Sequence, residues 1–414
     1  MLYVSDKISD DLIEVTDSYE DKGKLISVKD ALALGTKVYG LHSNDTITVY
    51  SSVQKFLDMY RMRQALCNSP VSYGIDYDIY LGLGLITMYS CTLSDSVIHD
   101  LVIPDFIDFI DGHVFEKKLN LRSVVIPSSV RSVGYGCFRG CKNLESVVID
   151  GISDLDIGNS VFESCERLRD IHLREGIRII SKSCFEGCTC LHELQLPDSL
   201  VQIGDSAFQF SGLETIKIPD SVKVVGGSAF TRCARLRYAY ISDAVQTIQS
   251  YCFSGCINLE EVHLPKGLKK IAEYAFKRTN LKELWLPDTV EFVGLSDFTS
   301  PEKLLSRLRI SKALLLKKQY AVFNHWYVDT VYLPEGLEEL DLNYILGWHF
   351  KVIRFSKSVK LRNASVLCSR RINQNVYLYG ISDSIDRVEV YDGSDAHIKL
   401  SMLEELRDKL KIIK

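Results

Sequence analysis

The chain has 414 residues, of which 46% are hydrophobic and 25% are charged, and its formal net charge is −5. This balance is typical of a folded globular protein, and the negative net charge argues against nucleic acid as a partner. No run of about 18 or more apolar residues occurs, so the sequence predicts no membrane-spanning helix.

Residues 1–70 carry no repeat and predict a small α/β cap or an independent domain. Strands are expected at Lys37–Leu41 and Thr46–Tyr50, followed by an amphipathic segment from Val53 to Leu66 with apolar residues at helical spacing. The segment Met1–Lys7 has no basic start followed by an apolar run, so it does not read as a secretory signal. We therefore expect a cytoplasmic protein, with the cell surface or secretion by an unrecognised route as the alternative.

A repeat of about 23 residues begins after this region. Residues 197–218 and 219–241 share the template P-x-S-V-x-x-I-G-x-x-A-F-x-x-C-x-x-L-x-x-L-x-L. The last apolar residue of each L-x-L unit recurs at intervals of 22 to 24 residues, at Leu81, Ile103, Ile126, Ile149, Leu173, Leu196, Ile218, Ile241, Leu264, Leu286, Ile310, Leu333, Phe355 and Leu378. This ladder predicts a solenoid over residues 71–385, with clear repeats at 101–298 and degenerate ones at 299–385.

The template explains how such a solenoid holds together. L-x-L alternates as a short strand does, so stacked turns should pair their strands into a parallel sheet along one face. The Val, Ile, Phe and Leu positions should form a continuous core, each burial contributing about 1.5–3 kcal/mol. Glycines recur just after the apolar pair, and we expect a tight turn with positive φ there. They are Gly134, Gly158, Gly204, Gly226 and Gly294.

The template resembles the BspA-like, or Treponema pallidum type, leucine-rich repeats. Ile218-Pro219-Asp220-Ser221-Val222 carries the likeness, together with Gly226, Ala229-Phe230 and Cys233. The resemblance implies a leucine-rich-repeat solenoid of α/β-type repeats. It also implies a role in binding, because the known relatives are mostly surface proteins that bind host proteins or other cells. A surface adhesin is therefore one candidate function.

Residues 386–414 are expected to cap the last turn. The segment Leu400–Lys414 places Leu403, Leu406 and Leu410 on one face among alternating charges, which predicts a terminal helix. A helix that pairs with another chain is the alternative reading.

Exposed positions beside the core residues of each L-x-L unit are the candidate binding residues. Aromatic rings and histidine next to acids resemble the composition of protein interfaces, although aromatics are also common on ordinary exposed sheets. The predicted partner-binding residues are Tyr238, Tyr240, Glu261, His263, Glu283, Trp285, His172, Lys217 and Tyr332. We interpret the chain as a non-enzymatic module, without a cofactor, that binds a protein partner.

Two other chemistries deserve comparison with this interpretation. Asp170 and His172 beside Glu193, and Glu261 and His263 beside Glu283, could bind a metal or act as acid and base, but each group has only one histidine. The same chemistry could lie in residues 1–70. No P-loop, G-x-S-x-G or H-E-x-x-H motif occurs.

Cysteines and one basic run also need an interpretation. Eight of the 12 cysteines fall on two template positions that elsewhere hold small core residues, so we expect reduced, buried thiols. Cys184, Cys188, Cys190 and His192 form the one group that invites a zinc interpretation. The run Lys303, Arg307, Arg309, Lys312, Lys317 and Lys318 is expected to be a solvated surface, with an acidic partner or phosphate as the alternative.

Overall fold

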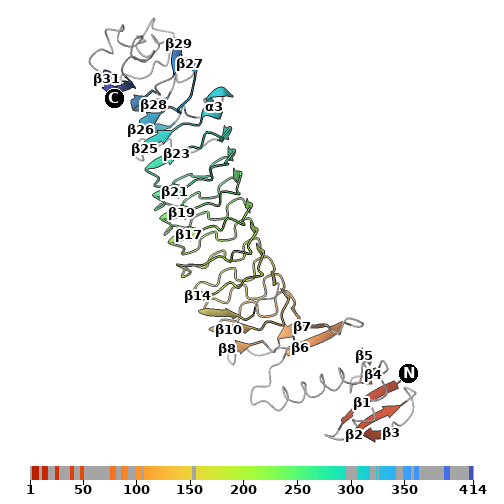
Figure 1. The fold of residues 1–414 in the computed structure, drawn as a ribbon. Coiled ribbons are helices and arrows are strands. Elements are labelled where there is room, and N and C mark those ends of the chain that lie inside the picture. Colours follow the sequence, from red (N-terminus) through yellow and green to blue (C-terminus); the bar gives the residue numbers. More distant parts are fainter. Residues whose placement is uncertain are drawn as a thin grey trace, which may run out of the picture.

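A computed structural model of the protein contains a solenoid of stacked turns (Figure 1). It describes residues 99–103, 107–151, 155–294, 305–317, 323, 326–341, 348–355 and 359–362, together with the backbone of nine further strands. These nine strands are β1 (Leu2–Ile8), β2 (Leu12–Thr16), β3 (Lys24–Ser27), β4 (Val38–Leu41), β5 (Ile47–Tyr50), β6 (Ile75–Tyr80), β7 (Leu85–Cys91), β30 (Arg387–Tyr391) and β31 (Leu410–Ile413).

The N-terminal strands form a sheet of their own, in the order β3-β2-β1-β4-β5. β1 runs parallel to β4, and the other pairs are antiparallel. The predicted strands near residues 38–41 and 47–50 are confirmed as β4 and β5. The predicted helix over residues 53–66 lies outside the described residues.

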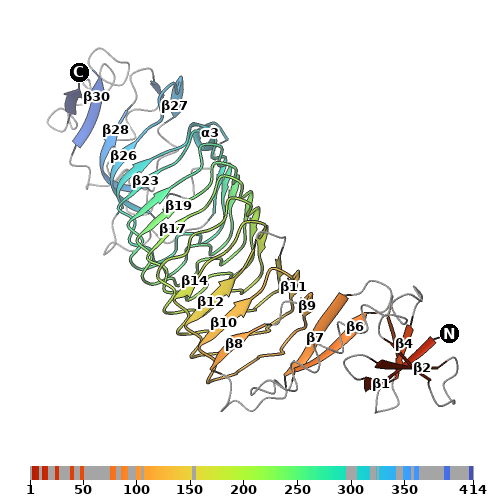
Figure 2. The same ribbon diagram turned by 60° about the horizontal axis from the view of Figure 1, so that its bottom comes forward.

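The L-x-L units line one side of the solenoid, which we call the L-x-L face (Figure 2). Its strands pair in parallel, with β30 and β31 continuing the last sheet. They are β8 (Asp100–Val102), β10 (Ser123–Ile126), β12 (Ser146–Ile149), β14 (Asp170–Ile171), β17 (Thr215–Lys217), β19 (Tyr238–Tyr240), β21 (Glu261–His263), β23 (Glu283–Trp285), β25 (Leu305–Arg309), β26 (Tyr327–Tyr332) and β28 (His349–Arg354).

A second set of parallel strands lies across the core, where the sequence predicted a sheet along one face only. We call this side the second face; β7 of the β6–β7 hairpin pairs with its first strand. Its strands are β9 (Phe109–Ile110), β11 (Ser132–Val133), β13 (Asp156–Ile157), β15 (Ile179–Ile180), β16 (Gln202–Ile203), β18 (Val224–Val225), β20 (Thr247–Ile248), β22 (Lys270–Ile271), β24 (Phe292–Val293), β27 (Glu339–Asp341) and β29 (Lys360–Arg362).

Helix is rare in the described part of the chain. Only α3 (Lys312–Leu316) is an α-helix there. The described repeats are therefore built of strands and turns, which corrects the expectation of α/β-type repeats. The prediction of a terminal helix is wrong for residues 410–413, which form β31, parallel to β30. Leu410-Lys411-Ile412-Ile413 includes two β-branched residues, and a strand partner was available to pair with it.

The predicted apolar ladder is confirmed wherever it is described. Twelve of its 14 residues, from Ile103 to Phe355, are buried, with at most 9% of their surface exposed. Leu81 and Leu378 lie outside the described residues. Each turn buries its apolar side against its neighbours, so the stability of the solenoid is a sum of contacts between turns.

Phenylalanines form a second continuous column inside the core. Neighbouring rings are stacked at centroid distances of 5.2 to 5.7 Å and interplanar angles of 3° to 12°. The members are Phe115, Phe138, Phe162, Phe185, Phe208, Phe230, Phe253 and Phe276. Phe298 lies outside the described residues.

Buried cysteines add a polar contact between turns. The thiol of Cys141 donates to the Phe115 carbonyl at 3.1 Å, and the same bond to the phenylalanine of the preceding turn recurs four times. The other four donors are Cys165, Cys188, Cys233 and Cys256. The prediction of burial is confirmed for these residues, and none of them is joined in a disulfide. The hydrogen bond from the thiol explains why cysteine, and not a purely apolar residue, occupies this position.

The repeated glycines serve a purpose different from the predicted one. Gly134, Gly158, Gly204, Gly226 and Gly294 do not have positive φ, so that prediction is wrong. A Cβ atom at any of them would instead lie 2.5 to 2.9 Å from backbone atoms of the preceding turn. These residues are glycine because the stacked backbones approach too closely for a side chain.

Positive φ occurs at two other positions in each of the eight turns from His113 to Arg278, on either side of the A-F pair. The first holds serine, glycine, histidine or tyrosine, as at Ser206 and Tyr251, and the second lies four residues later, as at Phe210 and Gly255. The left-handed conformation at both positions turns the chain around the phenylalanine column.

Carboxylates bond the backbone of the next turn along one ridge. Glu175 accepts from the backbone N–H groups of Asp198 and Ser199, and Asp243 accepts from that of Lys266 at 3.0 Å. These backbone hydrogen bonds hold the pKa of Glu175 and of Asp243 below the usual values. Each bond joins residues about 23 positions apart and fixes one turn against the next.

Candidate protein-binding face

The strands of the L-x-L face present the predicted residues to solvent. In β17, β19 and β23 the middle residue is buried, and its two neighbours are exposed or half-buried. Lys217, Tyr238, Glu261, His263, Glu283, Trp285 and His172 are exposed, while Tyr240 and Tyr332 are half-buried. The prediction that these side chains point away from the core is confirmed; their binding role stays a prediction.

Lys217, Tyr240 and His263 stand in one row across three strands. Lys217 is opposite Tyr240 in the β17–β19 pair, and Tyr240 is opposite His263 in the β19–β21 pair. The Tyr240 and His263 rings are stacked, with centroids 4.5 Å apart and planes 5° apart. This contact orders both rings before any partner arrives.

Trp285 and Tyr332 form a second ring pair, although β25 lies between their strands. The ring centroids are 5.3 Å apart. Arg309 occupies the position between them, but its guanidinium donates to the Leu286 carbonyl and to Asp288, both at 2.9 Å. Because Asp288 draws the guanidinium aside, the two rings can meet.

Charged groups orient the Trp285–Tyr332 pair. The indole Nε1 of Trp285 donates to Glu283 Oε2 at 3.1 Å, and Arg307 lies 3.1 Å from the other carboxylate oxygen of Glu283. The guanidinium carbon of Arg354 lies 5.7 Å from the centre of the Tyr332 ring. Sequence analysis did not select Arg354, whose only signal was its place in the degenerate L-x-L ladder.

The predicted residues fall into separate groups. Lys217, Tyr238, Tyr240, Glu261 and His263 share the β17–β19–β21 sheet, whereas Glu283, Trp285 and Tyr332 belong to the sheet that begins at β23. His172 follows β14, in an earlier sheet, and is joined to neither group. The structure therefore assembles eight of the nine residues on two adjacent sheets and leaves His172 apart.

The features considered for metal binding are explained by packing or by solvent exposure. His172 Nε2 lies 3.4 Å from Asp170, with 89% and 65% of the two side chains exposed. Cys184 and Cys188 are buried, and burial raises the pKa of each thiol, which disfavours the thiolate that zinc requires. Among the described residues no three histidine, cysteine or acidic side chains are grouped as metal ligands.

Three of the four described residues of the basic run form ion pairs within the chain. Arg307 pairs with Glu283, Arg309 with Asp288 and Lys317 with Glu291. Lys303 and Lys318 lie outside the described residues. These pairs fit the expected solvated surface. No helix in the described part of the chain is long and apolar enough to cross a bilayer.

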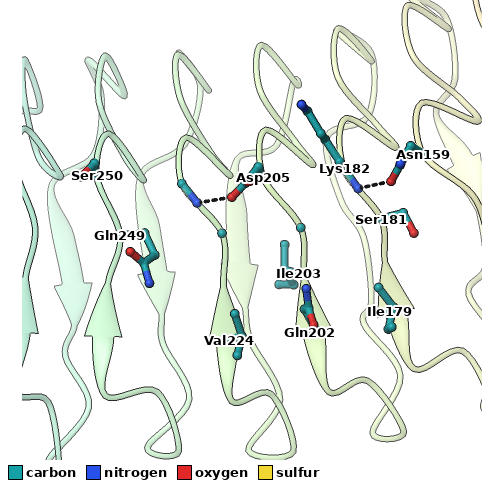
Figure 3. Close-up of a pocket in the computed structure, with 13 residues that line it drawn as sticks. Asn159, Ile179, Ser181, Lys182, Gln202, Ile203, Asp205, Val224, Gln249 and Ser250 are labelled. Atoms are coloured by element: carbon teal, nitrogen blue, oxygen red, sulfur yellow. Dashed lines mark hydrogen bonds between the residues drawn. The ribbon is translucent and has the colours of Figure 1, made fainter.

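A shallow groove on the second face was missed by sequence analysis (Figure 3). It has a volume of about 450 Å³ and lies over β15, β16 and β18. Polar side chains such as Gln202 and Asp205 line it, beside exposed Ile179 and Val224. The available signal was Gly227, which follows Gly226 at a position where Gly112 is also glycine but the other described turns carry larger side chains.

Comparison with known proteins agrees with the repeat pattern. A family model described as "BspA type Leucine rich repeat region" matches in six copies, over residues 79–156, 108–237, 155–279 and 246–370. The chain belongs to this family. A search of curated proteins finds no match. The BspA-type repeat therefore accounts for the fold and leaves the ligand open.

Three solved structures are similar to this BspA-type chain. A leucine-rich repeat protein from Bacteroides ovatus has 19% identity and a TM-score of 0.46, covering 84% of this chain and 100% of its own. The leucine-rich repeat protein of T. pallidum has 25% identity and a TM-score of 0.37, with coverages of 48% and 84%. A leucine-rich cell surface protein from Faecalibacterium prausnitzii has 19% identity and a TM-score of 0.35, with coverages of 80% and 98%.

Proposed function

We propose that this BspA-type protein is a non-enzymatic module that binds a protein partner through the L-x-L face. The observation that carries the proposal is the pair of ring contacts, Tyr240 with His263 and Trp285 with Tyr332, on adjacent sheets. Tyr238 and Trp285 each expose 46% of their surface beside these contacts. Large, exposed aromatic rings on a stiff support are the side chains that dominate protein interfaces.

The side chains of this face are ordered before a partner binds, which lowers the free-energy cost of binding. A side chain that a partner must immobilise costs about 0.5–1.5 kcal/mol of binding free energy. The rings of this face are already held by each other and by the Trp285–Glu283 hydrogen bond, so much of this cost is avoided. Glu261 and the Glu283–Arg307 ion pair place charges of both signs beside the rings, which would favour a partner with a complementary polar rim.

The test is capture of partners from native lysate by the wild type and by the quadruple variant Tyr238→Ala, Tyr240→Ala, His263→Ala, Trp285→Ala. We expect a protein held by the wild type to lose at least tenfold in affinity for the variant, because interface rings of this kind contribute about 2 kcal/mol or more each. Titration of the purified partner measures the change.

A matched control removes four exposed apolar side chains elsewhere: Tyr135, Phe210, Ile257 and Phe292, each changed to Ala. This control should bind as the wild type does, and both variants should keep the circular dichroism spectrum of the wild type. Equal binding by the wild type and a folded quadruple variant would refute the placement on the L-x-L face.

We further propose that the protein acts in the cytoplasm, with a surface adhesin as the alternative. Support comes from the five thiols that donate hydrogen bonds between turns, since this contact requires reduced cysteine. We expect native protein in the soluble cell fraction, with its thiols alkylated quantitatively after denaturation without reductant. Protein recovered on the cell surface would instead favour the adhesin.

A further inference from the structure

The groove on the second face is lined in part by Gly227, a glycine that has room for a side chain. Gly227 does not have positive φ, and a Cβ atom placed on it would meet only Ser250 O at 3.5 Å and Asp205 Oδ1 at 3.6 Å, both ordinary contacts. The same position holds Tyr135, Asn159 or Lys182 in other turns, and glycine again at Gly112. The fold therefore does not require glycine at 227, and its absent side chain leaves the groove unfilled.

The lining of the groove is polar and balanced in charge. Asn159, Ser181, Gln202, Gln249 and Ser250 supply amide and hydroxyl groups. Lys182 and Asp205 are the two lining residues with a formal charge, and their charges cancel. Figure 3 shows these side chains spread along several turns, with Gln202 and Gln249 at the groove. Such a surface offers many donors and acceptors and no net charge, so it suits a neutral, hydrogen-bonding ligand.

Backbone groups beneath the groove are already paired. β16 runs between β15 and β18 in one parallel sheet. The backbone N–H groups of Gly204 and Gly226 donate to Ile180 and Ile203 of the preceding turns. An extended peptide adds to an open strand edge through its main chain, and this surface presents a sheet face instead. Recognition here must rely on side chains.

Two tyrosines in the turns that follow Gly227 have an unusual backbone conformation. Tyr251 follows the lining residue Ser250, and its ring lies 5.2 Å from that of Tyr274 in the next turn. Both have φ of +58°, at a position that holds glycine or serine in the five turns from Gly136 to Ser228. Positive φ is strained for a bulky residue, and Tyr251 exposes 43% of its surface beside the half-buried Tyr274.

We propose that the groove binds a neutral oligosaccharide, on a face separate from the proposed protein-binding one. Sugar hydroxyls pair with amide and hydroxyl side chains, and the C–H faces of sugar rings pack on aliphatic and aromatic groups. Ile179 and Val224 provide aliphatic groups in the lining, and Tyr251, whose ring contacts that of Tyr274, directly follows the lining residue Ser250. The volume of about 450 Å³ lies within the usual range of small-ligand sites.

The experiment probes the full-length protein on an array of neutral and acidic glycans, followed by calorimetric titration of the best neutral ligand. Gly227→Asn should fill the groove and lower affinity at least tenfold, while Gly267→Asn serves as the matched control. A Cβ atom at Gly267 meets only one atom, at 3.9 Å, and its φ is not positive. This control should bind as the wild type does.

A second variant keeps the test decisive if Gly227→Asn fails to fold. Gln202→Ala with Gln249→Ala removes two amides from exposed side chains and should also lower affinity at least tenfold. The proposal would be overturned if the array retained no neutral glycan or only acidic glycans. It would also be overturned if the folded groove variants bound with the affinity of the wild type. None of these results bears on the L-x-L face, because its anchors lie outside the groove.

Discussion

Phe208→Ala should destabilise the protein by about 3–5 kcal/mol, the usual cost of truncating a buried phenylalanine. The Phe208 side chain is fully buried, and its ring lies 5.4 Å from that of Phe185 and 5.3 Å from that of Phe230. The substitution opens a cavity and removes both ring contacts at the middle of the column. Urea unfolding followed by circular dichroism measures the loss as a lower midpoint.

Phe292→Ala is the control for this effect. Phe292 lies on the second face with 39% of its surface exposed, and Lys270 lies above its ring. Its truncation leaves no enclosed cavity and should cost about 1 kcal/mol or less. Similar losses in the two variants would show that the phenylalanine column is not a principal source of stability.

Gly226→Ala should cost about 3 kcal/mol, the upper end of what an added methyl group costs in a tightly packed site. The new Cβ atom would lie 2.5 Å from the backbone N of Asp205 and 2.6 Å from the carbonyl carbon of Gly204. Backbone atoms cannot swing away as a side chain can, so two turns must separate. The thermal midpoint, measured by circular dichroism, should fall accordingly.

The neighbouring residue supplies the matched control for Gly226. Gly227→Ala places its Cβ atom 3.5 Å or more from its neighbours, without positive φ. Because alanine restricts the unfolded chain more than glycine does, we expect a change between zero and about 1 kcal/mol in favour of folding. A large loss here, or none for Gly226→Ala, would contradict the explanation by close backbone approach.

The core was predictable because its signal is repeated. A ladder such as Ile218, Ile241 and Leu264 keeps its interval even where the rest of the template changes, and burial requires only that interval. The exposed alternation of L-x-L follows from the same register, so the outward direction of Tyr238 and Trp285 could be predicted as well.

Features that depend on three-dimensional contacts were not predictable. Two-residue strands such as β16 are too short to show an alternation, so the second face had no periodic signal. The glycine column suggested positive φ because glycine permits it, yet the spacing of stacked backbones is what excludes a side chain at Gly204. At the C-terminus, helical spacing of leucines favoured a helix, but residues 410–413 pair with β30.

The arrangement of the candidate site was only partly predictable. The sequence places Tyr240 and His263 one turn apart at the same position of the repeat. Their rings stack because the two residues are opposite each other in the β19–β21 pair. The contact of Trp285 with Tyr332 spans two strands and depends on where Arg309 points. That direction is set by Asp288, which lies on a turn, and no spacing in the sequence reports it.

The two left-handed positions in each turn limit how this protein can change length during evolution. They lie four residues apart on either side of the phenylalanine column, as at Ser206 and Phe210 around Phe208. An insertion between them would move one ring out of the stack and shift the carbonyl of that phenylalanine away from the thiol of the next turn, as Phe208 O from Cys233. Duplication or loss of a complete turn preserves all these contacts, so lengths should differ among related solenoids by multiples of about 23 residues.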